Sequence, residues 1–107
     1  MGLNNDDDNA VPFRRQVLQT IKNYPPKTVN TGAAVQVLAA STIQRAIFRN
    51  ASETATVALG GSSVTLENAA IVLLPGDSWV EEDAAGAAWY ATSSDAGATV
   101  CVMGVER

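Results

Sequence analysis

The chain has 107 residues, a length that suits one domain and not two. Its formal net charge is −4 and its calculated isoelectric point lies near 4.5, and this acidic balance argues against a nucleic-acid-binding surface. With no histidine and a single cysteine, the sequence lacks the side chains for the usual imidazole metal centres, for Ser-His or Cys-His nucleophiles and for an intrachain disulfide. We therefore expect no metal, no cofactor and no enzymatic activity.

The first ten residues, "MGLNNDDDNA", contain neither the basic region nor the apolar run of a secretory signal. No stretch of the chain approaches the 18 apolar residues that a membrane-spanning helix needs. We therefore expect no leader and no membrane partner.

Charge is distributed unevenly along the chain. Residues 9–50 carry six basic residues and no acidic one, whereas residues 51–107 carry eight acidic residues and one basic one. This separation predicts that the front segment contacts an acidic surface, on the same chain, on a neighbouring copy or on another protein.

Residues 1–33 are predicted to form an N-terminal arm and linker. Four residues in it have the spacing of one face of a short helix: Phe13, Val17, Ile21 and Tyr24. Pro25 would end that helix. The same stretch, "QVLQTI", equally suits an extended arm along another surface, and the sequence leaves both alternatives open. The following "YPPKTVNTG" is typical of an irregular linker.

Residues 34–107 are predicted to form a single all-β domain. Short runs rich in Val, Ile, Thr and aromatic residues recur every 8 to 12 residues, with turn signals between them. The runs are "AVQVLAA", "TIQRAIFRN", "TATVALG", "SSVTLEN", "AIVLLP", "DSWVEE", "AAWYATS" and "ATVCVMGV". About eight short antiparallel strands predict a β-sandwich, a jelly roll or a small barrel, of which we favour the sandwich or jelly roll.

The run "TIQRAIFRN" alternates strictly between two faces. We expect one face to point to the core: Gln44, Ala46 and Phe48. The other face would then lie outside: Ile43, Arg45, Ile47 and Arg49.

The stretch "LLPGDSW" predicts a tight turn. Pro75 suits the second position of a type II turn, and Gly76 accepts the positive φ of the third. Asp77 is placed to hydrogen-bond back to the turn backbone. The turn is expected to be purely architectural, because the imidazole ligands of a metal-binding barrel are missing from the chain.

The remaining reactive and aromatic residues have structural interpretations. Cys101 alternates within the last run and is expected to pack in the core. Glu81, Glu82 and Asp83 are consecutive and are expected to form a solvated strand end. Two tryptophans lie within apolar runs and are expected to pack between sheets, the alternative being a stacking surface for a sugar: Trp79 and Trp89.

From Val35 to Met103 the order of phrases is informative: "VQVLAAS", "RAIFRNAS", "TVALGGSSVTLENAAIVLLPGDSW" and "AAWYATSSDAGATVCVM". This series resembles small tailed-bacteriophage virion proteins of the capsid decoration or cement type. In those proteins a strand ending in Asn is followed by an L-x-P-G-(D/E)-S turn, a W-Y-A strand and a closing A-T-V strand. The resemblance covers about 70 residues, and the segment before residue 34 is the part that it covers least.

The resemblance implies a structural β-sandwich or jelly-roll protein on the phage head surface, assembled in the host cytoplasm. The expected partners are the major capsid protein and further copies of the chain, as a dimer or trimer. Arm residues would contact the partner: Phe13, Arg14, Arg15, Val17, Ile21, Lys22 and Lys27. The alternative is a head- or tail-fibre module that binds a host surface glycan. A lyase or hydrolase that uses carboxylates alone is the weakest alternative, because no acid–base pair is evident.

Overall fold

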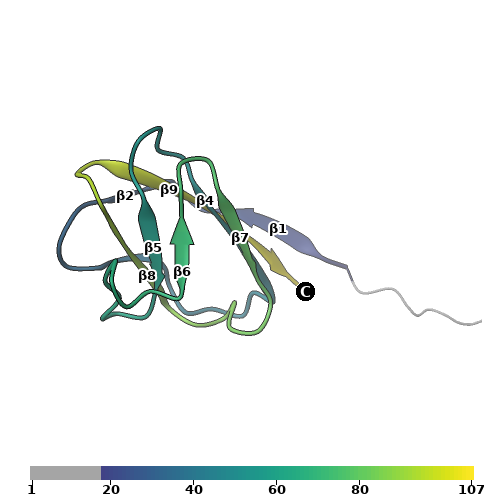
Figure 1. Ribbon diagram of the computed structural model, residues 1–107. Coiled ribbons are helices and arrows are strands. Elements are labelled where there is room, and N and C mark those ends of the chain that lie inside the picture. The colour runs from purple at the N-terminus through teal and green to yellow at the C-terminus, as the bar shows by residue number, and fades with distance from the viewer. Residues whose placement is uncertain (1–17) are drawn as a thin grey trace, which may run out of the picture.

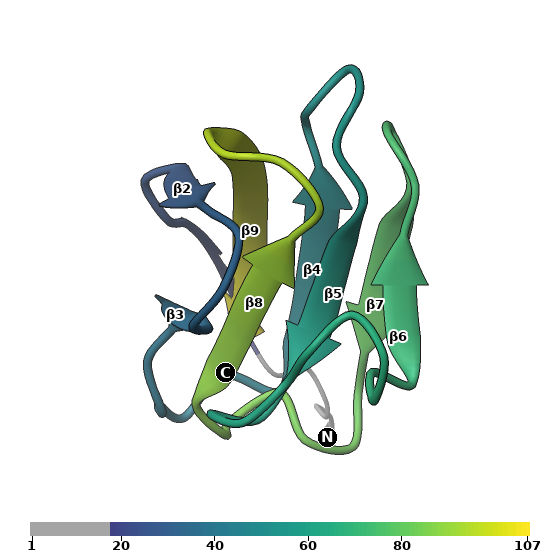
Figure 2. The ribbon, with the colours of Figure 1, turned by 60° about the vertical axis from the view of Figure 1, so that its left-hand side comes forward.

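The computed structural model describes residues 18–107, and within this range the chain is all-β, with nine strands and no helix. The strands are β1 (Thr20–Asn23), β2 (Lys27–Val29), β3 (Val35–Leu38), β4 (Arg45–Asn50), β5 (Val57–Gly60), β6 (Ile71–Leu73), β7 (Ser78–Glu81), β8 (Trp89–Ser93) and β9 (Ala98–Glu106). Two antiparallel sheets pack against each other (Figures 1 and 2). The predicted β-sandwich is therefore confirmed.

One sheet has the strand order β1-β9-β4-β7, with β2 also paired to β9, and we call it the five-stranded sheet. The other has the order β3-β8-β5-β6 and is called the four-stranded sheet. Strands β6 and β7 are consecutive in the chain but lie at the edges of different sheets, so the turn between them crosses from one layer to the other.

Strand β9 is the longest strand and organises the five-stranded sheet. It pairs with β4 on one side and with β1 and β2 on the other. Its residues alternate between buried and half-buried positions, with Val100 and Val102 in the core. This period of two is the expected signature of a strand with one face on a core and the other toward solvent.

The core lies between the sheets and is built largely from aliphatic side chains with one aromatic pair. Phe48 and Trp89 approach to a ring-centroid distance of 4.9 Å. Other fully buried side chains come from both layers: Val29, Val37, Val57, Leu59 and Val100. Close packing of small branched side chains suits the roughly 10 Å separation of two facing sheets.

The predicted turn at Leu74–Asp77 is confirmed. Gly76 has a φ of +85°, and Asp77 N donates to Leu74 O at 2.9 Å. The Asp77 carboxylate accepts a hydrogen bond from Leu74 N at 3.1 Å, as the sequence predicted. The turn is held to the five-stranded sheet by Asn50, whose carbonyl oxygen accepts from Gly76 N and whose N–H donates to Asp77 O, both at 2.9 Å.

The side chain of Asn50 is fully buried and fully used. Its Nδ2 donates to Ala55 O at 2.8 Å and to Leu73 O at 3.0 Å. Its Oδ1 accepts a hydrogen bond from Ser52 N at 3.0 Å. One polar residue therefore joins the end of β4 to the loop before β5 and to the edge strand β6.

The two predicted faces of "TIQRAIFRN" are partly correct. Ala46 and Phe48 are buried and Arg45 is exposed, as expected. Gln44 is exposed and Ile43 is buried, however, because both precede β4 and do not follow its alternation. Gly104 leaves room for Ile43: a Cβ there would lie 2.9 Å from the Ile43 Cδ1 atom.

The strand predicted for "SSVTLEN" is wrong, because residues 62–68 form turns. Thr65 N donates to Asn68 Oδ1 at 2.8 Å, and Asn68 N donates to Thr65 Oγ1 at 3.1 Å. Asn68 Nδ2 also donates to Ser63 O at 3.2 Å. Such local side-chain bonds offer the backbone an alternative to a strand ladder.

The segment that the sequence assigned to the arm joins the sandwich from β1 onward. Residues 20–23 are a strand paired with β9, so the helix alternative is wrong for them, whereas Phe13 and Val17 lie outside the described residues. The expected irregular linker contains β2, whose Val29 is fully buried in the core.

Candidate functional site

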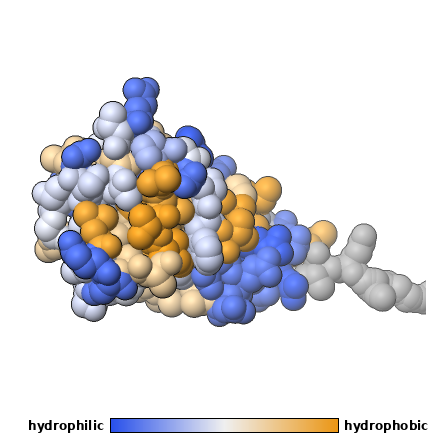
Figure 3. Space-filling view, viewed as in Figure 1, coloured by the Kyte–Doolittle hydropathy of each residue, from blue (hydrophilic) through white to orange (hydrophobic). Residues whose placement is uncertain are grey.

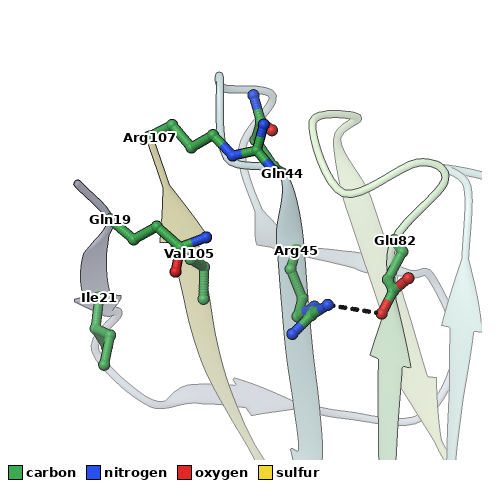
Figure 4. Close-up of a pocket in the computed structure, with 7 residues that line it drawn as sticks. All are labelled: Gln19, Ile21, Gln44, Arg45, Glu82, Val105 and Arg107. Carbon is green, nitrogen blue, oxygen red and sulfur yellow. Dashed lines mark ion pairs between the residues drawn. The ribbon is translucent and has the colours of Figure 1, made fainter. Parts of the chain in front are cut away.

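The candidate binding surfaces of the described residues are a groove on the outer face of the five-stranded sheet and the two edges of that sheet. A groove of about 510 Å³ opens on the outer face at the end where β9 finishes (Figure 4). It is lined by Gln19, Ile21, Gln44, Arg45, Glu82, Val105 and Arg107. The side chains come from both edges and the centre of the sheet, so we call this feature the outer-face groove.

The ladder register explains why these side chains meet. Ile21 lies directly opposite Val105, and Val105 lies opposite Arg45. Arg45 Nη2 then reaches Glu82 Oε2 at 3.0 Å (Figure 4). Directly opposed residues of an antiparallel ladder share a face, so the row runs across the sheet on its outer side.

A second hollow of about 360 Å³ continues the outer face toward the other end of the sheet. Its lining includes Ile47, Arg49, Met103 and Cys101. The expectation that Cys101 packs in the core is therefore wrong: it is half-buried on the outer face, on the opposite side of β9 from Val100 and Val102.

Lys22 is tied to its own sheet. Its Nζ lies 3.3 Å from Glu106 Oε1, and Thr42 Oγ1 donates to Glu106 Oε2 at 2.6 Å. The hydrogen bond from Thr42, followed by the hydrogen bond and charge of Lys22, lowers the pKa of Glu106. The contact fastens β1 to the last strand of the domain.

The acidic run after β7 is more than the solvated strand end that the sequence predicted. Glu81 Oε1 accepts from Trp79 Nε1 at 3.0 Å, and Glu81 Oε2 accepts from the backbone N–H groups of Asp83 and Ala84 at 3.1 and 2.9 Å. The hydrogen bond from Trp79 is the largest cause of a lowered pKa of Glu81. Glu81 therefore acts as a carboxylate that shapes the loop after β7.

The two tryptophans have different environments. Trp89 is only 7% exposed, and its Nε1 donates to Ala84 O at 2.9 Å, so its predicted packing between the sheets is confirmed. Trp79 is 40% exposed on the edge strand β7, so the same prediction is wrong for it. An edge strand has no neighbour on one side to cover a large ring.

Apolar surface gathers on the side where β6 and β7 run (Figure 3). The exposed large apolar residues on these strands and their turn are Val72, Leu74, Trp79 and Val80. Sequence reasoning missed this grouping, because it depends on two edge strands of different sheets lying on the same side of the sandwich. The signal for this apolar surface that the sequence offered was the pair of apolar residues Trp79 and Val80 in the short run "DSWVEE".

The structure separates the predicted partner-binding residues. Phe13, Arg14, Arg15 and Val17 lie outside the described residues. Ile21 lies in the outer-face groove, Lys22 pairs with Glu106, and Lys27 lies on β2 opposite Val100. Ile21 and Lys22 thus point to opposite faces of the same edge strand.

Residues 18–107 contain no grouping of three or more His, Cys, Asp or Glu side chains with the geometry of a metal site. Within this same range there is also no helix long and apolar enough to span a membrane.

No protein-family model, curated protein or solved structure matches the chain.

Proposed function

We propose that the chain is a structural virion protein of a tailed bacteriophage, a decoration or cement protein that binds the outside of the head and acts without catalysis or cofactor. Two observations support the proposal. The ordered phrases from Val35 to Met103 resemble such proteins. The chain is also a small all-β sandwich, a fold whose sheet edges are suited to strand addition by a partner.

The attachment of the N-terminal segment is the observation that carries the proposal. β1 pairs along four residues with the end of β9, and the Lys22–Glu106 contact reinforces this pairing. β1 therefore ties the first described residues to the longest strand of the domain. A partner that holds the segment would thereby hold the whole sandwich.

The partner contact is assigned to the residues before Leu18. Phe13 and Val17 supply apolar groups, and Arg14 and Arg15 supply two positive charges without an acidic residue between them. This composition fits an acidic surface of the major capsid protein that has apolar pockets. Lys22 is assigned a different role, because its ammonium group is paired with Glu106.

Head-binding assays with truncated protein test the proposal. Removing residues 2–17 leaves every described strand intact, so the truncated domain is expected to fold and to lose binding to phage heads that lack the protein. Co-sedimentation and cryo-electron microscopy measure occupancy. The double variant Arg14→Glu/Arg15→Glu is expected to weaken binding, and Arg49→Glu/Arg107→Glu, at two exposed arginines of the sandwich, is the matched double charge reversal outside this segment. Undiminished occupancy by the truncated protein would contradict the proposal.

The exposed ring of Trp79 supports one alternative, a fibre module that stacks a host glycan on this side chain. In that case Trp79→Ala abolishes glycan binding in calorimetry, whereas Trp89→Phe, at the buried position, retains it. Absence of glycan binding by the wild-type protein would eliminate this alternative.

A further inference from the structure

The two edges of the five-stranded sheet are formed by strands of opposite character. β1 and β2 form one edge, and each contains a lysine, Lys22 and Lys27. β7 forms the other edge, has the sequence SWVE and contains no basic residue or proline. Glu82 and Asp83 directly follow it. Glu81 is the one charged side chain of β7, so Trp79 and Val80 have neither a lysine nor a proline beside them to oppose strand addition.

Both edges expose large apolar side chains on the outer face. Ile21 on β1 is 63% exposed and Val80 on β7 is 50% exposed. Val80 lies opposite Ile47 in the ladder, and Ile21 lies opposite Val105. On the inner face, Trp79 lies opposite the buried Phe48 and is left half-covered at the edge.

We infer that β7 of one copy pairs antiparallel with β1 of a second copy and extends the five-stranded sheet from one molecule into the next. The strand order β1-β9-β4-β7 is antiparallel throughout, so a second copy's β1 continues the alternation of strand direction. Because β1 and β7 lie at opposite edges of their own sheet, this pairing joins different molecules.

Strand length selects the register. Both strands have four residues, and only one antiparallel register pairs all of them. It places Val80 opposite the second copy's Ile21 and Trp79 opposite the second copy's Lys22. Ser78 and Glu81 then meet the second copy's Asn23 and Thr20.

The same register keeps each side chain on its proper face. Val80 and Ile21 both belong to the outer face, so the two exposed apolar groups cover each other. Trp79 and Lys22 both belong to the inner face, since their ladder neighbours Phe48 and Gly104 are buried. The aliphatic stem of Lys22 then covers the exposed indole, while its ammonium group stays paired with Glu106. A shift of one residue in this register would place outer-face side chains of one strand opposite inner-face side chains of the other.

The β7–β1 register also brings opposite charges close to each other. It places Glu81 opposite the second copy's Thr20, with the second copy's Lys22 two residues further along the same face. The contact is heterologous, so it generates a ring when its rotation closes and a filament when it does not.

This inference concerns the contact between copies and does not depend on the proposed attachment to a phage head. It uses β1 and β7 and leaves the contact with the capsid to the residues before Leu18. Self-association of the pure protein tests it, whereas head binding tests the proposed function, so either can fail alone.

Two single variants test the pairing by analytical ultracentrifugation and light scattering. The wild-type protein is expected to form assemblies larger than a monomer, whose fraction rises with concentration. Val80→Glu and Ile21→Glu are each expected to be monomeric, because each disables one of the two edges, and the two altered edges repel each other. An equimolar mixture of these variants is expected to form a 1:1 heterodimer, since the intact β1 edge of the first meets the intact β7 edge of the second.

Val35→Glu is the matched control, because Val35 is 40% exposed on an edge strand of the four-stranded sheet and takes no part in the pairing. It is expected to assemble as the wild type does. Circular dichroism and thermal unfolding establish that every variant is folded. A wild-type protein that stays monomeric at its highest soluble concentration overturns the inference. The inference is also overturned if the single variants assemble as the wild type does, or if their mixture stays monomeric.

Discussion

At the scale of single residues, Asn50 is the polar side chain on which the fold depends most. Its three side-chain hydrogen bonds satisfy two carbonyl groups and one N–H at a site that water does not reach. Asn50→Ala is expected to lower the free energy of unfolding by roughly 3 kcal/mol, because buried partners are left unsatisfied. Urea unfolding measures the change. Asn68→Ala, in an exposed turn, is the control, and its free energy of unfolding is expected to fall far less.

Glu81 makes stability depend on pH. Hydrogen bonds, first from Trp79 and then from the loop backbone, lower its pKa in the folded protein below the unfolded value near 4.5. Because the pKa of Glu81 is lower in the folded than in the unfolded state, the stabilisation by its carboxylate is fully present above the unfolded pKa. It is lost as pH falls through the folded pKa. In thermal unfolding, the advantage of the wild type over Glu81→Gln is therefore expected to shrink as pH falls below 4.5. A difference that is constant with pH would contradict this role.

At the scale of elements, the turn at Leu74–Asp77 carries the chain from the four-stranded to the five-stranded sheet. Gly76 has a φ of +85° with open space around its Cα, so a side chain there meets backbone strain and no steric contact. Gly76→Ala is expected to cost about 1–2 kcal/mol in chemical denaturation. Gly61→Ala is the matched control, because Gly61 has equal space and no positive φ, and its effect is expected to be much smaller.

The same scale shows why sequence patterns identified some strands and missed others. β4 alternates strictly and its buried residues Ala46 and Phe48 were predicted, whereas residues 62–68 have β-like composition but fold into turns through Thr65 and Asn68. β2 was read as linker because its three residues follow two prolines. A short strand of this kind is stabilised by its partner β9 and not by its own pattern.

At the scale of the whole molecule, the first strands are part of the folded unit. Val29 is fully buried among core residues of both sheets, and β1 and β2 satisfy the outer edge of β9. A fragment of residues 34–107 is therefore expected to be less stable than one of residues 18–107. Loss of the buried Val29 side chain alone accounts for about 1.5–3 kcal/mol. Equal denaturant midpoints for the two fragments would contradict this account of the domain.

The sequence by itself determined the all-β class, the turn at Pro75–Gly76 and the inward face of β4, because these follow from local rules: side-chain alternation and the φ preferences of single residues. Tertiary structure alone decided which strands are edges, that Trp79 is exposed while Trp89 is buried, and that Lys22 meets Glu106. These features depend on pairing between residues far apart in the chain. Two tryptophans in equally apolar runs receive opposite environments because one strand has neighbours on both sides and the other has only one.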